Sequence, residues 1–390
     1  MRILFADQFS DFGGAQLALR DVMDEGAERG WESWFAAPGS GGLFEYCRKS
    51  GIATHTLPVG AYRNGSKSLG DMARYAFDMA RSAKSVGEIV RQNRIELAYF
   101  NGPRVLAAAA GIRCPLIFHL HSALDKTYSR AIARLLLSRR GATVIVASHF
   151  VARPLEIAPG GEKLRLIYNG VRDCGFVPRP RAGRTATVGM IGRIAPEKGH
   201  LDFVQAAGML AAKGRDVRFI VVGAALFSDP AYEARVRAAA AGGTVEFRGW
   251  TDDVASVLHE IDVLAVPSSG AECSPRILIE AFSAGTPIVA YRSGGIPELV
   301  RSGETGLLTA QNTPEALAAS IDQLLTGRGY MARLSANGRR EWDSRFRIER
   351  FRNEVAEVVE RRGYVETRQP DAPAAVAGEE YLSPAGAPHR

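Results

Sequence analysis

Strand-like and helical segments alternate along almost the whole chain, and no other feature restricts the possible folds as strongly. In the first half, helical patterns over residues 14–29, 68–93 and 126–140 separate short apolar runs. These runs read as buried strands: RILFA, SWFAA, ELAYF, PLIFHL, ATVIVAS and LRLIY. Because parallel strands need a crossover between them, the alternation predicts βαβ units and a parallel sheet covered on both faces.

The same alternation starts a second time after a segment that reads as a linker. Residues 171–184, VRDCGFVPRPRAGR, are rich in Pro, Arg and Gly, as linkers and turns often are. Further strand-like runs follow: TATVGMIG, VRFIVVG, GTVEFRG, DVLAVPS and TPIVA. Both halves open with a strand, a Gly-containing turn and a helix, and 390 residues suit two domains. The sequence therefore predicts an α/β protein with two Rossmann-like domains facing each other.

We place the first domain at residues 1–175 and the second at residues 176–345. A charged helix over 346–365 follows, which can pack back on the first domain. Residues 366–390 are rich in Pro, Ala and Gly, so we expect a disordered tail. In a two-domain α/β protein the ligand is expected in the cleft, at the carboxyl ends of both sheets.

The net charge of +7 lies in the first half of the chain. Residues 1–175 hold 23 basic and 16 acidic residues, whereas residues 176–390 hold 26 of each. The basic residues are not interleaved with aromatic ones and no nucleic-acid motif is present, so a membrane surface or an anionic acceptor is the favoured partner. One helical segment carries five cations, at Lys126, Arg130, Arg134, Arg139 and Arg140. It could lie on anionic lipid, and it could equally be an ordinary solvated helix.

Targeting and redox signals are few. No apolar run approaches the ~20 residues that span a bilayer, and the N-terminus MRILFAD lacks the pattern of a signal peptide. The four cysteines show neither metal-ligand spacing nor a disulfide framework. We expect a cytoplasmic protein, with peripheral contact to the cytoplasmic face of the membrane as one option.

Two glutamates stand in an otherwise apolar stretch, AECSPRILIEAFSAGTPIVA, at residues 271–290. Glu272 precedes a helix expected to begin at Pro275, and Glu280 lies on that helix, which Gly285 ends. The helix N-terminus offers free N–H groups and a positive dipole end, which suit an anion. One carboxylate could then bind a polar ligand beside the anion, and the other could bind hydroxyl groups along the helix. On periodicity alone, a solvated helix residue and a loop charge explain the pair better.

The segment GRIAPEKGH, residues 192–200, also follows a strand and opens a helix. It places Arg193 and Lys198 where a diphosphate would lie, and two cations can neutralise a leaving diphosphate without a metal. A solvated loop explains the motif equally well when it is taken alone. The chain has no Asp-x-Asp triplet, and Asp252-Asp253 reads as the start of a helix, so we expect no metal and no cofactor.

The second half resembles the nucleotide-sugar-binding domain of retaining glycosyltransferases with the GT-B fold, family four of that classification. The segments that carry the resemblance are GRIAPEKG, VPSSGAECSPRILIEAFSAGTPIVA and SGGIPELVRSGETGLL. By resemblance, Glu272 contacts the sugar hydroxyls of the donor and Glu280 contacts its ribose. Arg193 and Lys198 would hold the diphosphate. The resemblance thus implies a nucleoside-diphosphate sugar as the donor substrate.

The first half matches the same family more loosely but in the right order. In FGGAQLAL, the pair Gly13 and Gly14 occupies the loop that brings backbone amides to the phosphate and the acceptor in family members. His121, at the end of the strand PLIFHL, matches the family's active-site histidine. His119 should point to the same face, since side chains alternate along a strand.

One departure from the family pattern concerns the residues after Glu272. Many members have Phe-Gly-Leu there, whereas this chain has Cys273, Ser274, Pro275 and Arg276. Pro275 has no amide to offer. A Pro-Arg version also occurs in the family, so Ser274 and Arg276 stay in the expected donor site, where Arg276 can supply a group of its own.

The resemblance implies transfer of a sugar to an acceptor hydroxyl with retention of the anomeric configuration, in the synthesis of a bacterial glycan, glycolipid or polysaccharide. The leaving β-phosphate oxygen would take the acceptor proton, and the catalytic set would be Glu272, His121, Arg193 and Lys198. Two alternatives stay open: a sugar-nucleotide epimerase of similar fold, and a catalytically silent nucleotide-binding partner. An NAD-dependent oxidoreductase is disfavoured because no G-x-G-x-x-G follows either opening strand.

Overall fold

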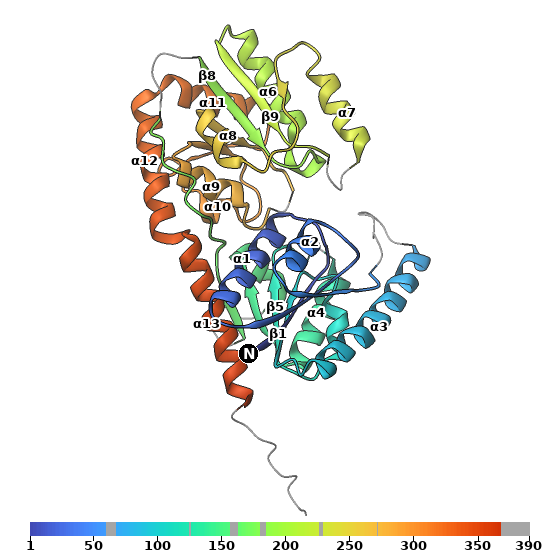
Figure 1. Ribbon diagram of the computed structural model, residues 1–390. Coiled ribbons are helices and arrows are strands. Elements are labelled where there is room, and N and C mark those ends of the chain that lie inside the picture. Colours follow the sequence, from blue (N-terminus) through green and yellow to red (C-terminus); the bar gives the residue numbers. More distant parts are fainter. Residues whose placement is uncertain are drawn as a thin grey trace, which may run out of the picture.

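The computed structural model contains two α/β bodies stacked one on the other, with the last helix running along the first of them (Figure 1). It describes residues 1–59, 68–124, 126–156, 163–179, 185–225, 229–270 and 272–367. Residues 180–184 of the predicted linker and residues 368–390 of the predicted tail lie outside these ranges.

The first body is built on a seven-stranded sheet in which every described pairing is parallel. Its order is β3-β2-β1-β4-β5-β6-β7, with bounds β1 Arg2–Asp7, β2 Glu32–Ala37, β3 Ala53–Thr56, β4 Leu97–Asn101, β5 Leu116–Leu120, β6 Thr143–Val146 and β7 Leu164–Leu166. Six of these strands match the predicted runs. The polar strand β3 was not predicted, because ATHT has no apolar run.

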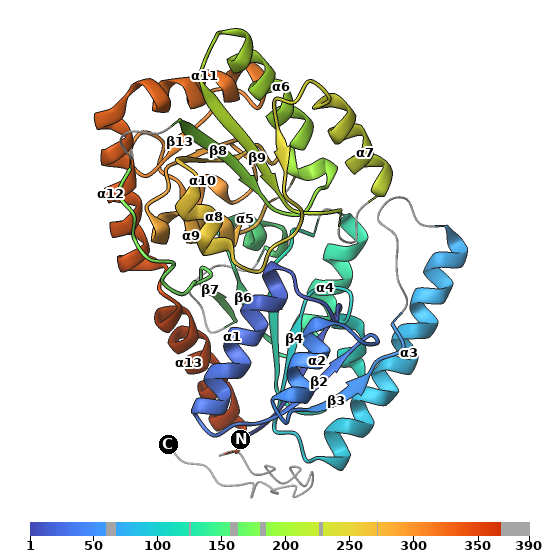
Figure 2. The same ribbon diagram turned by 45° about the horizontal axis from the view of Figure 1, so that its top comes forward.

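Helices cover both faces of this sheet, as the alternation predicts (Figure 2). They are α1 Gly14–Glu28, α2 Gly42–Lys49, α3 Leu69–Gln92, α4 Thr127–Arg139 and α5 His149–Ala152, with the 3₁₀ turns η1 Leu106–Gly111 and η2 Arg153–Leu155. Along β1, Ile3 and Phe5 join one core and Leu4 and Ala6 join the other, and all four are fully buried. A strand buried on both faces is apolar at every position, which explains why the run RILFA does not alternate.

The second body repeats the design with a parallel six-stranded sheet of order β10-β9-β8-β11-β12-β13. Its strands are β8 Ala186–Ile191, β9 Val217–Val222, β10 Glu246–Phe247, β11 Val263–Val266, β12 Ile288–Ala290 and β13 Leu307–Leu308. Its helices are η3 Pro196–Lys198, α6 His200–Ala212, α7 Pro230–Ala239, α8 Val254–Glu260, α9 Arg276–Ala284, α10 Ile296–Leu299, α11 Pro314–Thr326 and α12 Arg328–Arg345. Asp253 caps α8, as predicted from Asp252-Asp253.

The last helix, α13 (Ile348–Thr367), returns to the first body and lies beside α1 in both views. Phe351 and Val355 join the core that contains Ile3 and Phe5. Arg352 of α13 pairs with Asp24 of α1 at 3.2 Å. The helix runs two residues beyond the predicted end at residue 365, and its contacts hold α13 against the first domain.

Candidate active site

The loop after β8 packs directly on the loop after β11. The amides of Ser269 and Gly270 donate to the carbonyl of Glu197 at 3.0 and 3.1 Å. Gly199 has φ +79°, and a Cβ there would lie 2.0 Å from the carbonyl oxygen of Pro267. Only glycine accepts this backbone conformation and this close approach. The segment GRIAPEKGH is therefore a fixed part of the site rather than a freely solvated loop.

Lys198 and Glu272 meet through their side chains: the Nζ of Lys198 donates to Oε1 of Glu272. The two side chains are 28% and 14% exposed, so the pair is partly shielded from water. The main chain of Glu272 is held as well, because its carbonyl accepts from the amide of Gly295 at 2.6 Å. Gly294 has φ +56°, and a Cβ on it would lie 2.0 Å from the same carbonyl oxygen. Two residues predicted for the site thus form one contact.

Arg193 is engaged by the loop that carries it. Its guanidinium pairs with the carboxylate of Glu197, four residues later. Both side chains are about one third to one half exposed, at 31% and 43%. Without a ligand, each of the two predicted phosphate-binding cations therefore faces a carboxylate, and an incoming diphosphate would share or replace these partners.

The helix α9 begins at Arg276, one residue later than predicted, and Pro275 is its N-cap with φ −65° and ψ 115°. Because its ψ is extended, Pro275 is the last residue of the preceding loop and not the first residue of the helical turn. No side chain caps the helix, and in its first turn the amide of Leu278 donates to the carbonyl of Pro275 at 3.2 Å. Glu280 lies one turn further on, half-buried. Burial raises the pKa of its carboxyl group, and the nearby charge of Arg276 opposes this shift.

Four polar atoms of the predicted site are buried without a hydrogen-bond partner among the described residues: Oγ of Ser274, Nε2 of His121, and Nε and Nη1 of Arg276. The carbonyl of Ser274 is bound, since Asn169 Nδ2 donates to it at 3.0 Å. Buried polar atoms are bonded in more than about 90% of cases. Buried polar atoms that lack a hydrogen-bond partner at a predicted ligand site are therefore positions where the polar groups of a ligand would bind.

His121 follows β5 directly and contacts His119, with ring centroids 3.8 Å apart and the ring planes tilted by 38°. The two residues share a face, as predicted. The ring of His119 is held by the hydroxyl of Tyr99 at 2.5 Å from Nδ1. Burial, and then the positive charge of Arg276, lower the pKa of His121 to about 3. His121 is therefore a neutral imidazole at physiological pH and can donate or accept a hydrogen bond.

The Gly13–Gly14 pair lies at the start of α1, with Gly13 as an uncapped N-cap. A buried polar network that the sequence analysis missed supports this loop. The carboxylate of Asp7 accepts from Gln16 Nε2 at 2.9 Å, from Asn101 Nδ2 at 2.5 Å and from the amide of Phe9 at 2.8 Å. Burial raises the pKa of Asp7 to about 6.

An ion pair joins the two domains beside these residues. Nη1 of Arg276, on α9, lies 3.1 Å from Oδ2 of Asp21, on α1. A Cβ on Gly14 would lie 4.0 Å from Cδ of Arg276, so the arginine lies beside the start of α1. Asp21 was not predicted from the sequence. Its position seven residues after Gly14, on the same face of a helix, was the available signal.

A second contact between the domains involves Glu298 of α10. Its carboxylate accepts from the amides of His149 and Phe150 at 2.8 and 2.7 Å, and from the hydroxyl of Tyr168 at 3.1 Å. It therefore caps the first turn of α5 in the other domain. The segments SHF and SGGIPELV meet at this point. Glu298 thus ties α10 to the first domain, and this role was not predicted from the sequence.

Some of the cations predicted on the basic helix α4 bind backbone carbonyls of the protein itself. Arg134 donates to the carbonyl of Pro154 at 2.8 Å, and Arg140 to that of Ala110 at 2.5 Å. Leu137 is buried in the core. The exposed side of the helix instead carries Ile132 and Leu135, 49% and 48% exposed. Two of the five cations are thus used to hold the fold.

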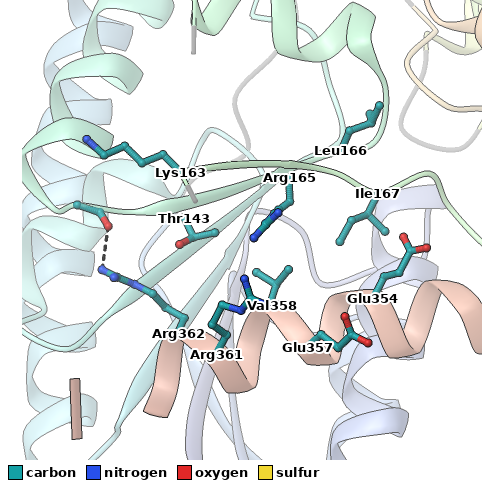
Figure 3. Close-up of a pocket in the computed structure, with 11 residues that line it drawn as sticks. Thr143, Lys163, Arg165, Leu166, Ile167, Glu354, Glu357, Val358, Arg361 and Arg362 are labelled. Atoms are coloured by element: carbon teal, nitrogen blue, oxygen red, sulfur yellow. Dashed lines mark hydrogen bonds between the residues drawn. The ribbon is translucent and has the colours of Figure 1, made fainter. Parts of the chain in front are cut away.

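A separate cavity of about 410 Å³ lies between the start of β7 and the end of α13 (Figure 3). Its lining mixes the cations Lys163, Arg165, Arg361 and Arg362 with Glu354 and Glu357. None of the residues predicted for the donor site lines it. The site described above is therefore distinct from this cavity.

Three further features bear on the predictions made from composition. None of the four cysteines, all of which lie in the described ranges, forms a disulfide. Among the residues that the structure describes, no helix is both long and apolar enough to cross a membrane. Within the same ranges, no three His, Cys, Asp or Glu side chains gather as a metal-binding group would.

Solved structures share this architecture over nearly the whole chain. The crystal structure of Anabaena Alr3699/HepE in complex with UDP and glucose covers 92% of this chain and 99% of its own, with a TM-score of 0.76 and 25% identity. WaaG, a glycosyltransferase involved in lipopolysaccharide biosynthesis, shares the fold with a TM-score of 0.70 at 16% identity. Two facing Rossmann-like sheets with this loop arrangement define the GT-B class of glycosyltransferases.

Family models identify the family within that class. The model "Glycosyltransferase Family 4" matches residues 12–173, and "Glycosyl transferases group 1" matches residues 185–327, so together they cover more than half of the chain. The chain belongs to glycosyltransferase family four.

Curated relatives match parts of this chain. A phosphatidyl-myo-inositol mannosyltransferase of Mycolicibacterium smegmatis is 28% identical over 290 residues, which are 68% of this chain and 72% of that protein. A 2-deoxystreptamine glucosyltransferase of Streptomyces kanamyceticus is 36% identical over 162 residues, 40% of each. The match thus spans less than half of the second relative.

Proposed function

We propose that this protein is a retaining glycosyltransferase that moves a hexose from a nucleoside-diphosphate sugar to an acceptor hydroxyl in glycan, glycolipid or polysaccharide synthesis. One observation carries the proposal: Lys198 and Glu272 meet at the carboxyl end of the second sheet, beside the uncapped start of α9. In this proposal the cation and the positive end of α9 would bind a diphosphate, and the carboxylate would bind sugar hydroxyls. Relatives named mannosyltransferases and glucosyltransferases, and a relative solved with UDP-glucose, are consistent with this donor.

In the proposed reaction, the bond from the anomeric carbon to the β-phosphate oxygen breaks while the acceptor oxygen bonds to the same carbon from the same face. The acceptor proton passes to the leaving β-phosphate oxygen, so no side-chain base is required. Lys198, Arg193 and the amides of α9 would stabilise the charge on the leaving diphosphate. Glu272 would orient the sugar hydroxyls, Glu280 the ribose, and the neutral His121 a sugar hydroxyl near the reacting carbon.

We further propose that the transfer needs no metal ion. Two cations stand where a metal would otherwise neutralise the diphosphate, and Lys198 can serve Glu272 and an oxyanion together because an ammonium has three N–H donors. Arg193 would exchange Glu197 for phosphate oxygens, which a guanidinium binds in a bidentate manner.

The test is product analysis with purified protein. UDP-, GDP- and ADP-sugars are incubated with and without lipid and sugar acceptors, and the products are separated and identified by mass spectrometry. A glycosylated acceptor with the anomeric configuration of the donor is expected. A donor converted to its epimer without acceptor would indicate an epimerase, and binding without any conversion would indicate a silent nucleotide-binding partner.

We also propose that the protein works in the cytoplasm and contacts anionic membrane surfaces through α4. Four described cysteines without a disulfide are consistent with a reducing compartment, and Ile132, Leu135 and the exposed Arg139 lie on one side of the helix. Co-sedimentation with anionic liposomes at low salt is expected, and it should weaken in Leu135→Ser. Wild-type protein that stays in the supernatant would contradict this contact, and the acceptor would then be sought among soluble sugars.

A further inference from the structure

The ion pair between Asp21 and Arg276 is buried, and it joins residues of different domains. The side chains are 1% and 10% exposed. A buried carboxylate without a partner is costly, so Asp21 needs the guanidinium whenever the domains are in this arrangement. Arg20 gives only partial compensation, since its Nη2 lies 3.3 Å from the other oxygen of Asp21 and its side chain is 28% exposed.

Arg276 is placed among all the groups that the proposed reaction would use. It is the first residue of α9, whose N-terminus would face the diphosphate. Its stem passes the start of α1 at Gly14, and its charge acts on both His121 and Glu280. One side chain therefore lies near residues of both domains and acts on the charges of two of them.

The guanidinium keeps unused donors in this position. Nε of Arg276 is buried and has no hydrogen-bond partner among the described residues, and the Nη1 contact with Asp21 is an ion pair without hydrogen-bond geometry. A buried N–H without an acceptor is rare in folded proteins. Together with Oγ of Ser274 and Nε2 of His121, this donor is suited to oxygen atoms of a bound ligand.

We propose that Asp21 is a positioning residue of the transfer reaction. It holds Arg276 across the domain junction, so that the start of α9 and the Gly13–Gly14 loop keep a fixed separation and the remaining N–H donors of Arg276 point at the donor substrate. This inference rests on the proposed function. The attraction within a buried ion pair is nearly balanced by the cost of removing both charges from water. The pair therefore fixes the geometry of the domain junction more than it adds to the free energy of domain closure.

The first experiment compares Asp21→Asn with Asp24→Asn. Asp24 lies on the same helix and pairs with Arg352 of α13 instead of crossing to the second domain. We expect Asp21→Asn to lower kcat by about tenfold or more, while the Kd for UDP, GDP or ADP, whichever binds, changes less than about threefold. The control should keep kcat within about twofold. An unchanged kcat in Asp21→Asn would overturn the proposal.

The second experiment is a double-mutant cycle with Arg276→Gln. If Asp21 acts through Arg276, the double variant should be no slower than Arg276→Gln alone, whereas independent roles would multiply the two losses and contradict the proposal. Asp21→Glu, which keeps the charge, should recover part of kcat.

The same cycle is measured by thermal unfolding without substrate, where the two substitutions should again be non-additive. If that coupling is present and no donor is turned over by the wild type, the proposed function fails while the ion pair stands. Additive melting-temperature changes would refute the pairing itself.

Discussion

Replacing Lys198 by alanine tests the proposed donor site most directly. Two unit charges about 3 Å apart at an effective dielectric constant near 20 attract by about 5 kcal/mol before desolvation is subtracted. With side chains 28% and 14% exposed, the Lys198–Glu272 pair lies between a surface and a buried contact. The same ammonium would face the leaving diphosphate, where one such donor contributes about 3 kcal/mol to the transition state. Lys198→Ala should therefore lower kcat/KM by about 100-fold.

The assay is initial-rate kinetics with a matched donor and acceptor, with circular dichroism to verify folding. Lys213→Ala is the control, because this exposed lysine lies at the far end of α6 from Lys198. Arg193→Lys, in the same loop, should recover only part of the wild-type rate, since the planar fork is lost. A Lys198→Ala variant that is folded and works within about threefold of wild type would refute the proposed role of this cation.

Three further predictions address the remaining groups. Glu272→Ala should lower turnover strongly while the Kd of the nucleoside diphosphate stays near wild type; an equal loss in that Kd would refute a role on the sugar. Saturating EDTA should leave the rate unchanged, whereas activity that vanished and returned with magnesium or manganese would refute metal independence. The third concerns Asp7, whose pKa is about 6 in the folded protein against a reference of 3.8. The folded state binds the proton of Asp7 more tightly than the unfolded state does. The contribution of Asp7 to the free energy of unfolding therefore grows as the pH falls from about 6 to about 4, by up to about 3 kcal/mol. Urea unfolding should show this gain relative to Asp7→Asn, and parallel pH curves for the two proteins would contradict it.

Local sequence patterns determined the architecture and the loops that carry the site. Apolar runs between helical segments predicted six strands of the first sheet and five of the second, because a strand buried on both faces must be apolar throughout. The pattern failed where an element is short or polar, as in β3 and β13. It also placed Pro275 one position too far into α9, since proline fits both the N-cap and the first turn.

The side-chain contacts of the candidate site, within and between the domains, were decided by tertiary structure alone. Glu272 and Lys198 could be proposed separately from their places at strand ends, but no spacing in the sequence shows that their side chains meet. Asp21 and Arg276 lie on different domains, as do Glu298 and the start of α5, so no helical or strand period relates them. Such contacts depend on how two separately formed cores pack, whereas strands and helices follow from periodicities within a few residues. The sequence by itself determined which loops follow the strands at the candidate site, and packing within and between the domains determined which charges meet there.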